Sequence, residues 1–77
     1  MLTLKYFGRL QELTGRSEES MPAEQNTVAE LKAFLEKKYP DLAQASFTVA
    51  VDQQIAEETK DISGASEVAL LPPFSGG

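Results

Sequence analysis

Three observations in the sequence predict a single α+β domain. The chain has 77 residues, which is the size of one small domain. One segment, residues 27–39, carries apolar side chains at the spacing of an amphipathic helix, and four or five other segments have the short pattern of strands. Because a lone amphipathic helix must bury its apolar stripe, we expect a mixed sheet to cover that face of the helix.

The first strand is predicted over residues 2–7, where apolar and polar side chains alternate. Leu2, Leu4 and Tyr6 share one face, which we expect to meet the core. Phe7 falls on the opposite, polar face. Either a short helix covers Phe7, or its ring belongs to an exposed patch that contacts a partner. The alternation leaves both interpretations open.

A short helix is predicted over residues 9–14, because Leu10 and Leu13 are three apart and Gly15 stands at a position typical of a helix C-terminus. The next segment, residues 16–21, is polar and is predicted to be a loop. A second interpretation is an acidic edge strand, which would pair with the first strand and resist edge-to-edge aggregation.

The main helix is predicted over residues 27–39. Thr27 and Glu30 have the spacing of a capping box, which satisfies free amide groups at a helix start. Pro40 ends the helix at the residue before it. The apolar stripe that we expect to enter the core consists of Val28, Leu31, Phe34, Leu35 and Tyr39.

The remaining strands are predicted in the second half of the chain. Residues 47–51 alternate, and a turn over residues 52–54 leads to a short returning strand that begins at Ile55. Ile62 is expected to fill the core from a loop. Residues 67–71 form the last predicted strand. Placed beside the first strand at the centre of the sheet, this last strand would run parallel to it.

The composition limits the chemistry that this chain performs alone. It contains neither cysteine nor histidine, which removes disulfides, thiolate nucleophiles, imidazole bases and the usual zinc ligands, so no metal site is predicted. The adjacent pairs Glu18–Glu19 and Glu57–Glu58 are interpreted as surface charge rather than as an acid–base dyad.

The charge and the hydropathy pattern limit the partners. A formal net charge of −5 disfavours nucleic acid and suits docking on a basic protein. The longest apolar runs are only a few residues, and the N-terminus has no basic region followed by an apolar run. We therefore expect no membrane association and a cytoplasmic location.

Residues 72–77 are predicted to be an extended C-terminal tail of this one domain. Pro72 and Pro73 end the last strand and favour an extended conformation that points away from the sheet. Gly76 and Gly77 have no side chains and can thread a narrow channel. The four residues after Pro73 reach roughly 13–14 Å, enough to enter another protein's active site. We interpret the terminal carboxylate as the functional group, which a partner must activate because an ionised carboxylate is a poor electrophile.

Four stretches resemble the small subunit of molybdopterin synthase, a ubiquitin-like sulfur-carrier family. They are the opening residues 4–15 (Leu-Lys-Tyr-Phe-Gly-Arg-Leu-Gln-Glu-Leu-Thr-Gly), the helix start 27–31, the strand and turn 49–53, and the ending 67–77 (Glu-Val-Ala-Leu-Leu-Pro-Pro-Phe-Ser-Gly-Gly). The Pro-Pro-x-Ser-Gly-Gly end is the most specific part, while Leu70 and Leu71 stand where many members carry aromatics. The resemblance implies the β-grasp fold, a mixed four- to five-stranded sheet packed on one main helix.

The resemblance also implies a mechanism. An E1-like adenylyltransferase would use ATP and Mg²⁺ to adenylate Gly77, and sulfur would replace the AMP to give a thiocarboxylate. The tail would then donate sulfur to cyclic pyranopterin monophosphate in the large synthase subunit, within a heterotetramer of two small and two large subunits. The chain would act as a sulfur donor, with no cofactor of its own and no catalysis in isolation.

The same resemblance assigns the contacts. Gly76 and Gly77 form the reacting end, and the partner-binding residues are expected to be Phe7, Ile55, Leu71, Pro72, Pro73, Phe74 and Ser75. One alternative is the thiamine-pathway sulfur carrier, which shares the fold and the Gly-Gly end but usually lacks the Pro-Pro-x-Ser pair. Another is a ubiquitin-like modifier or interaction module, whose tail forms isopeptide bonds with lysines or does no chemistry.

Overall fold

The structure is a computed structural model that describes residues 1–73. Within that range it contains five strands, two α-helices and one 3₁₀-helix. In chain order these are β1 (Leu2–Tyr6), α1 (Arg9–Thr14), β2 (Glu18–Met21), α2 (Val28–Lys38), η1 (Pro40–Gln44), β3 (Thr48–Val51), β4 (Gln54–Ala56) and β5 (Glu67–Leu71). The predicted α+β class with one main helix is confirmed.

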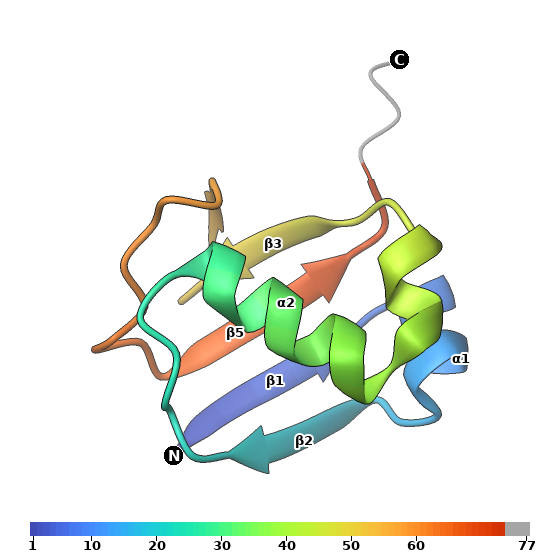
Figure 1. Ribbon diagram of the computed structural model, residues 1–77, viewed down its shortest axis with the longest axis horizontal. Helices are drawn as coiled ribbons and strands as arrows, with labels where there is room; N and C mark the ends of the chain where they lie inside the picture. Colours follow the sequence, from blue (N-terminus) through green and yellow to red (C-terminus); the bar gives the residue numbers. More distant parts are fainter. Residues whose placement is uncertain (74–77) are drawn as a thin grey trace.

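The strands form one mixed sheet in the order β2-β1-β5-β3-β4. β1 and β5 run parallel at its centre, with Leu4 opposite Val68, and the other pairs are antiparallel. This confirms the predicted pairing of the first and last strands. Figure 1 shows α2 lying across one face of the sheet, with α1 and η1 together at one end. A mixed sheet that packs on one main helix in this strand order is the ubiquitin-like β-grasp fold.

The core lies between α2 and the sheet. Because side chains alternate along a strand, each central strand sends every second residue toward the helix. Leu42 from η1 and Ile62 from the loop before β5 close the ends of the core, and both are at most 1% exposed. The full set of core side chains is Leu2, Leu4, Tyr6, Leu10, Met21, Val28, Leu31, Leu35, Leu42, Val49, Val51, Ile62, Val68 and Leu70.

The start of α2 is capped from two sides. The N–H of Glu30 donates to the Thr27 hydroxyl at 3.2 Å, as the capping-box spacing predicts, while the Glu30 carboxylate accepts from the N–H of Asn26. The first two helical N–H groups donate to the carbonyl oxygens of Lys60 and Glu58, at 3.0 and 2.9 Å. A loop distant in sequence therefore satisfies amide groups that a helix cannot satisfy itself.

The hairpin of β3 and β4 is fixed by its turn. Asp52 and Gln53 have φ values of 48° and 72°, the left-handed conformation typical of two-residue hairpin turns. One carboxylate oxygen of Asp52 accepts the N–H groups of both Ser66 and Glu67 at 3.0 Å. The backbone of Asp52 therefore takes part in the turn, while its side chain anchors the turn to the start of β5.

The prediction of a loop over residues 16–21 is wrong, and the alternative of an edge strand is confirmed. Residues 18–21 form β2, which pairs antiparallel with β1 in the register Leu4 opposite Glu19. Local propensity does not favour a strand in so polar a segment. The strand forms because β1 offers a free edge and because Glu19 and Met21 find partners on the inner face.

Phe34 was predicted to be in the core stripe of α2, and this prediction is wrong. Its side chain is 39% exposed, whereas Val28, Leu31 and Leu35 are at most 1% exposed. Consecutive helical residues are about 100° apart around the helix axis. Of the residues in the predicted stripe, Phe34 is therefore rotated farthest from Val28, at the edge of the face that meets the sheet. Tyr39 is only partly buried against the core.

Leu35→Ala is expected to lower the free energy of unfolding by about 2–5 kcal/mol, because it leaves a cavity between α2 and the sheet. Phe34→Ala is the matched control, since it truncates the neighbouring exposed side chain and is expected to cost about 1 kcal/mol or less. Urea unfolding followed by circular dichroism measures both. Equal losses would contradict this placement of the buried face of α2.

Candidate functional site

The C-terminal tail begins where β5 ends at Leu71. Proline has no N–H to donate, so Pro72 and Pro73 cannot continue the sheet ladder, and both are exposed. The described part of the site is therefore the base of the tail. Four predicted site residues lie outside the described range, and their roles stay predictions: Phe74, Ser75, Gly76 and Gly77.

The turn between β1 and α1 packs directly against the first proline. Gly8 in this turn has a φ of 58°, a conformation that favours glycine. A Cβ atom on Gly8 would lie 2.8 Å from Cγ of Pro72, so the missing side chain permits the close approach. The N–H of Phe7 donates to the carbonyl of Leu70 at 3.0 Å, which extends the β1–β5 pairing to this point. The tail therefore begins at a stretch of backbone that is held by the β1–β5 hydrogen bonds and by the close packing of Gly8 against Pro72.

The sheet face opposite α2 carries three of the predicted docking residues. Phe7 is 42% and Ile55 58% exposed, and Leu71 is half-buried. In the register, Ile55 lies opposite Ala50, which lies opposite Ala69. Small side chains therefore separate the larger ones, and the face is shallow and partly apolar. Since α1 leaves Phe7 exposed, the interpretation that a helix covers Phe7 is wrong, and contact with a partner stays a prediction.

A groove of about 660 Å³ opens beside the base of the tail. We call it the α1–η1 groove, after the two elements that form most of its walls. Its lining consists of Arg9, Leu10, Leu13, Asp41, Gln44, Ala45, Ser46, Pro72 and Pro73. Sequence reasoning missed this feature, because its walls come from three segments that only the fold brings together.

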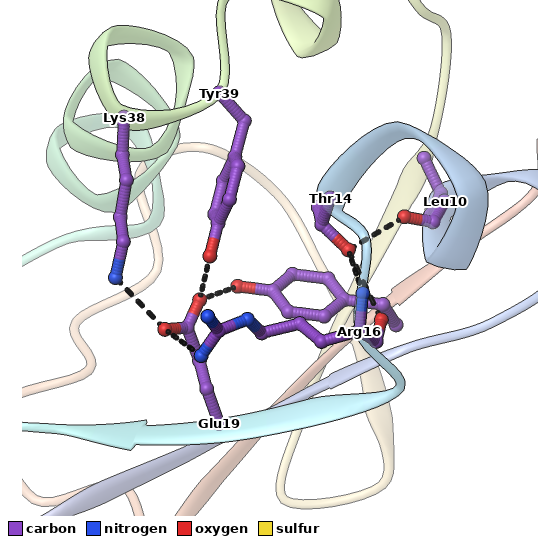
Figure 2. A network of polar contacts seen from close by, with 7 residues as sticks. Leu10, Thr14, Arg16, Glu19, Lys38 and Tyr39 are labelled. Atoms are coloured by element: carbon purple, nitrogen blue, oxygen red, sulfur yellow. Dashed lines mark hydrogen bonds and ion pairs between the residues drawn. The ribbon is translucent and has the colours of Figure 1, made fainter.

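On the helix side of the sheet, Glu19 of β2 is the centre of a polar network (Figure 2). Its side chain is only 6% exposed. The hydroxyls of Tyr6 and Tyr39 each donate to Oε1 of Glu19 at 2.6 Å. Nζ of Lys38 lies 2.8 Å from Oε2, and the Arg16 guanidinium lies 3.3 Å from the same oxygen. The network joins β2 to β1 and to the end of α2.

The network shifts the pKa values of its members. Burial opposes ionisation of Glu19, but hydrogen bonds from Lys38 and from the two tyrosines outweigh it and lower the pKa of that carboxyl to about 2. Burial, and then the hydrogen bond to Glu19, raise the pKa of both Tyr6 and Tyr39. The hydrogen bond to Glu19 raises the pKa of Lys38. None of these shifts moves a group toward neutral pH, so the network serves structure rather than proton transfer.

The interpretation of Glu19 as surface charge is therefore wrong, while Glu18 beside it is exposed as expected. Alternation along β2 turns Glu19 inward together with Met21 and leaves Glu18 outside. The sequence itself shows no alternation of apolar and polar residues here, because Glu18, Glu19 and Ser20 are all polar, and the inward position of Glu19 follows from the pairing of β2 with β1. Of the second pair, Glu57 and Glu58 are both exposed, and Glu58 forms an ion pair with Lys32 at 2.8 Å.

Residues 1–73 contain neither a cluster of metal-binding side chains nor a helix able to span a membrane. No three acidic side chains in this part of the chain gather closely enough to hold a metal ion. In the same range, no helix has both the length and the apolar character that crossing a bilayer requires.

Solved structures share this fold. The putative molybdopterin converting factor, subunit 1, from Pyrococcus furiosus superposes with a TM-score of 0.80 at 22% identity, covering 95% of this chain and 97% of that one. Small archaeal modifier protein 1 from Haloferax volcanii gives a TM-score of 0.79 at 20% identity, with coverage of 95% and 97%. The class defined by fold is that of the small ubiquitin-like β-grasp proteins.

Sequence similarity defines the family within that class. The model of the ThiS family matches residues 4–77, which is nearly the whole chain. The molybdopterin synthase sulfur carrier subunit of Caenorhabditis briggsae is 35% identical over 78 residues, which cover 94% of this chain and 92% of that protein. The chain belongs to the ThiS family.

Glu19→Gln is expected to remove part of the acid sensitivity of the fold. Because the folded-state pKa of Glu19 is lowered from 4.5 to about 2, its ionised form stabilises the protein above pH 4.5, and this contribution is lost as the pH falls toward 2. The shift corresponds to about 3 kcal/mol of unfolding free energy at neutral pH. Urea unfolding at a series of pH values measures it.

The control for Glu19→Gln is Glu18→Gln, which removes the neighbouring exposed carboxylate from the same strand. Its pH profile is expected to follow that of the wild-type chain. If the profile of Glu19→Gln also follows the wild type between pH 4.5 and 2, the role of the network in acid stability is refuted.

Proposed function

We propose that this chain is a sulfur carrier in molybdopterin biosynthesis and that the carboxylate of Gly77 carries the sulfur. The observation that carries this proposal is the 35% identity, across 94% of the chain, to a protein named molybdopterin synthase sulfur carrier subunit. The Gly76–Gly77 end supports it, because two residues without side chains suit a narrow channel.

The geometry at the base of the tail supports delivery of the chain end. β5 is a central strand, paired on both sides, and it runs directly into the two prolines. Gly77 is four residues after Pro73, which gives the segment between them a reach of roughly 13–14 Å. The chain also lacks cysteine and histidine, so the terminal carboxylate is the plausible site for covalent chemistry.

The proposed reaction proceeds in two stages on two partners. An E1-like adenylyltransferase, with ATP and Mg²⁺, joins the Gly77 carboxylate to AMP and releases pyrophosphate, and a sulfur nucleophile then displaces the AMP. The resulting thiocarboxylate enters the active site of the large subunit, where sulfur passes to cyclic pyranopterin monophosphate. Two such transfers build the dithiolene, and the carrier returns each time as a carboxylate. The cytoplasm is the proposed location.

Docking on the large subunit is proposed to use the sheet face and the tail. Phe7, Ile55 and Leu71 supply exposed or half-exposed apolar surface on that face. The residues from Pro72 to Ser75 then guide the glycines into the active site. The proposed assembly contains two small and two large subunits.

A reconstituted reaction tests the proposal. The thiocarboxylated chain, the large subunit and cyclic pyranopterin monophosphate are expected to yield molybdopterin, detected as a fluorescent oxidised derivative. Deletion of Gly77 is expected to abolish the product, with the circular dichroism spectrum unchanged because the core lies within residues 2–70. Transfer that survives the deletion refutes the proposal. Thiazole formation in place of molybdopterin would assign the chain to the thiamine pathway, and isopeptide bonds to lysines would make it a modifier.

Phe7→Asp is expected to weaken binding to the large subunit at least about tenfold, because it places a charge in an apolar contact. Isothermal titration calorimetry measures the affinity, and thermal unfolding checks the fold. Phe34→Asp is the control, since it adds the same charge at a similarly exposed ring on α2, across the molecule from the docking face. Equal weakening by both variants, or a collapse in stability with Phe7→Asp, would be inconsistent with the proposed surface.

A further inference from the structure

Apart from Pro72 and Pro73, no residue of the α1–η1 groove has a role in the mechanism described above. It lies beside Pro72 and Pro73, which form part of its lining. Its other walls come from α1 and from η1 with the residues that follow it. The groove is therefore on the helical end of the molecule, apart from the docking face on the sheet that carries Ile55.

The short tail brings a partner close to this groove. Gly77 is four residues after Pro73, so it lies at most roughly 13–14 Å from that proline. A protein that encloses the Gly77 carboxylate in an active site must therefore place its own surface near Pro73. Since Pro72 and Pro73 line the groove, the surface around the active-site entrance is brought to the mouth of the groove.

The chemistry of the groove favours one kind of contact. Arg9 is exposed in its lining and is absent from the four salt bridges found among the described residues, which use Lys5, Arg16, Lys32 and Lys38. The rest of the lining is mixed, because Leu10, Leu13, Ala45 and the two prolines are apolar whereas Asp41, Gln44 and Ser46 are polar. A guanidinium can bind a carboxylate through two parallel hydrogen bonds, which gives both strength and geometry.

We propose that the α1–η1 groove receives a loop of the large subunit, which places a carboxylate against Arg9 and an apolar side chain over Leu13 and Ala45. This inference rests on the proposed function and adds a second contact region to it. The contact holds the carrier from the helical side while the sheet face docks on the other.

Charge reversal at Arg9 tests the proposal. Arg9→Glu is expected to weaken binding to the large subunit about tenfold or more, measured by isothermal titration calorimetry at 50 and 200 mM salt. Arg9→Lys keeps the charge but loses the paired hydrogen bonds, so it is expected to weaken binding, though less than Arg9→Glu does. Lys37→Glu is the matched control, because it makes the same change in net charge at an exposed residue of α2 that lies outside the groove lining. It is expected to stay within about threefold of the wild type.

The outcomes separate this proposal from the proposed function. If the wild-type chain binds the large subunit and the Arg9→Glu and Lys37→Glu variants bind it with equal affinity, the groove contact is refuted. The proposed carrier function is then unaffected. Failure of the wild-type chain to bind the large subunit refutes the carrier function and the groove contact with it. Rescue of Arg9→Glu by an arginine in place of one acidic residue of the large subunit would identify the contact directly.

The chain's own tail is the competing occupant of the groove. Removal of residues 74–77 without any partner present is expected to leave the amide NMR shifts of Leu10, Leu13 and Ala45 unchanged. Shifts at these positions would mean that the tail itself fills the groove, and would overturn the proposal.

Discussion

The parallel pairing of β1 with β5 is the interaction on which the rest of the structure depends. It joins the first and last strands at the centre of the sheet, so everything between them is one long crossover. Both strands also have a neighbour on their other side, which leaves their backbone groups paired along both edges. Their inward side chains, Leu4 and Val68 among them, are fully buried beneath α2. Loss of this pair would detach both the core and the tail.

The same pairing explains why a short tail is enough. A strand bonded on both sides is a stiff base, and the hydrogen bond from Phe7 to Leu70 carries that support to the start of the prolines. Gly8 then allows the turn after β1 to pack against Pro72. The position of the tail's base is thus determined by the most buried part of the molecule. Ordering the base in the free protein reduces the entropy that binding must overcome.

The Glu19 network stabilises the part of the sheet that local sequence supports least. β2 is a four-residue edge strand with two glutamates and a serine, and its ladder alone would be weak. Two tyrosine hydroxyls and two cations satisfy the buried carboxylate of Glu19, so its burial does not leave a charge unpaired. One of those tyrosines extends from β1 and the other follows α2. The network therefore joins strand and helix layers at one corner of the domain.

Local patterns in the sequence determined much of this protein. The alternation of apolar and polar residues predicted β1, β3 and β5, and the capping box predicted the start of α2. The absence of cysteine and histidine favoured the terminal carboxylate as the reactive group. The sequence also predicted that β1 and β5 would run parallel if placed side by side at the centre of the sheet, and the structure has them so. These features depend on residues close together in the chain, so a local sequence pattern is enough to predict them.

Only the tertiary structure decided the features that join distant segments. Glu19 is buried because Tyr6, Lys38 and Tyr39 converge on it from two other elements. Phe34 is exposed because three other side chains of α2 already fill the space above the sheet. The α1–η1 groove exists because η1 packs near α1, beside the prolines that end β5. For Glu19 and for the groove, the deciding contacts come from segments many residues away in the chain, where no local pattern indicates them.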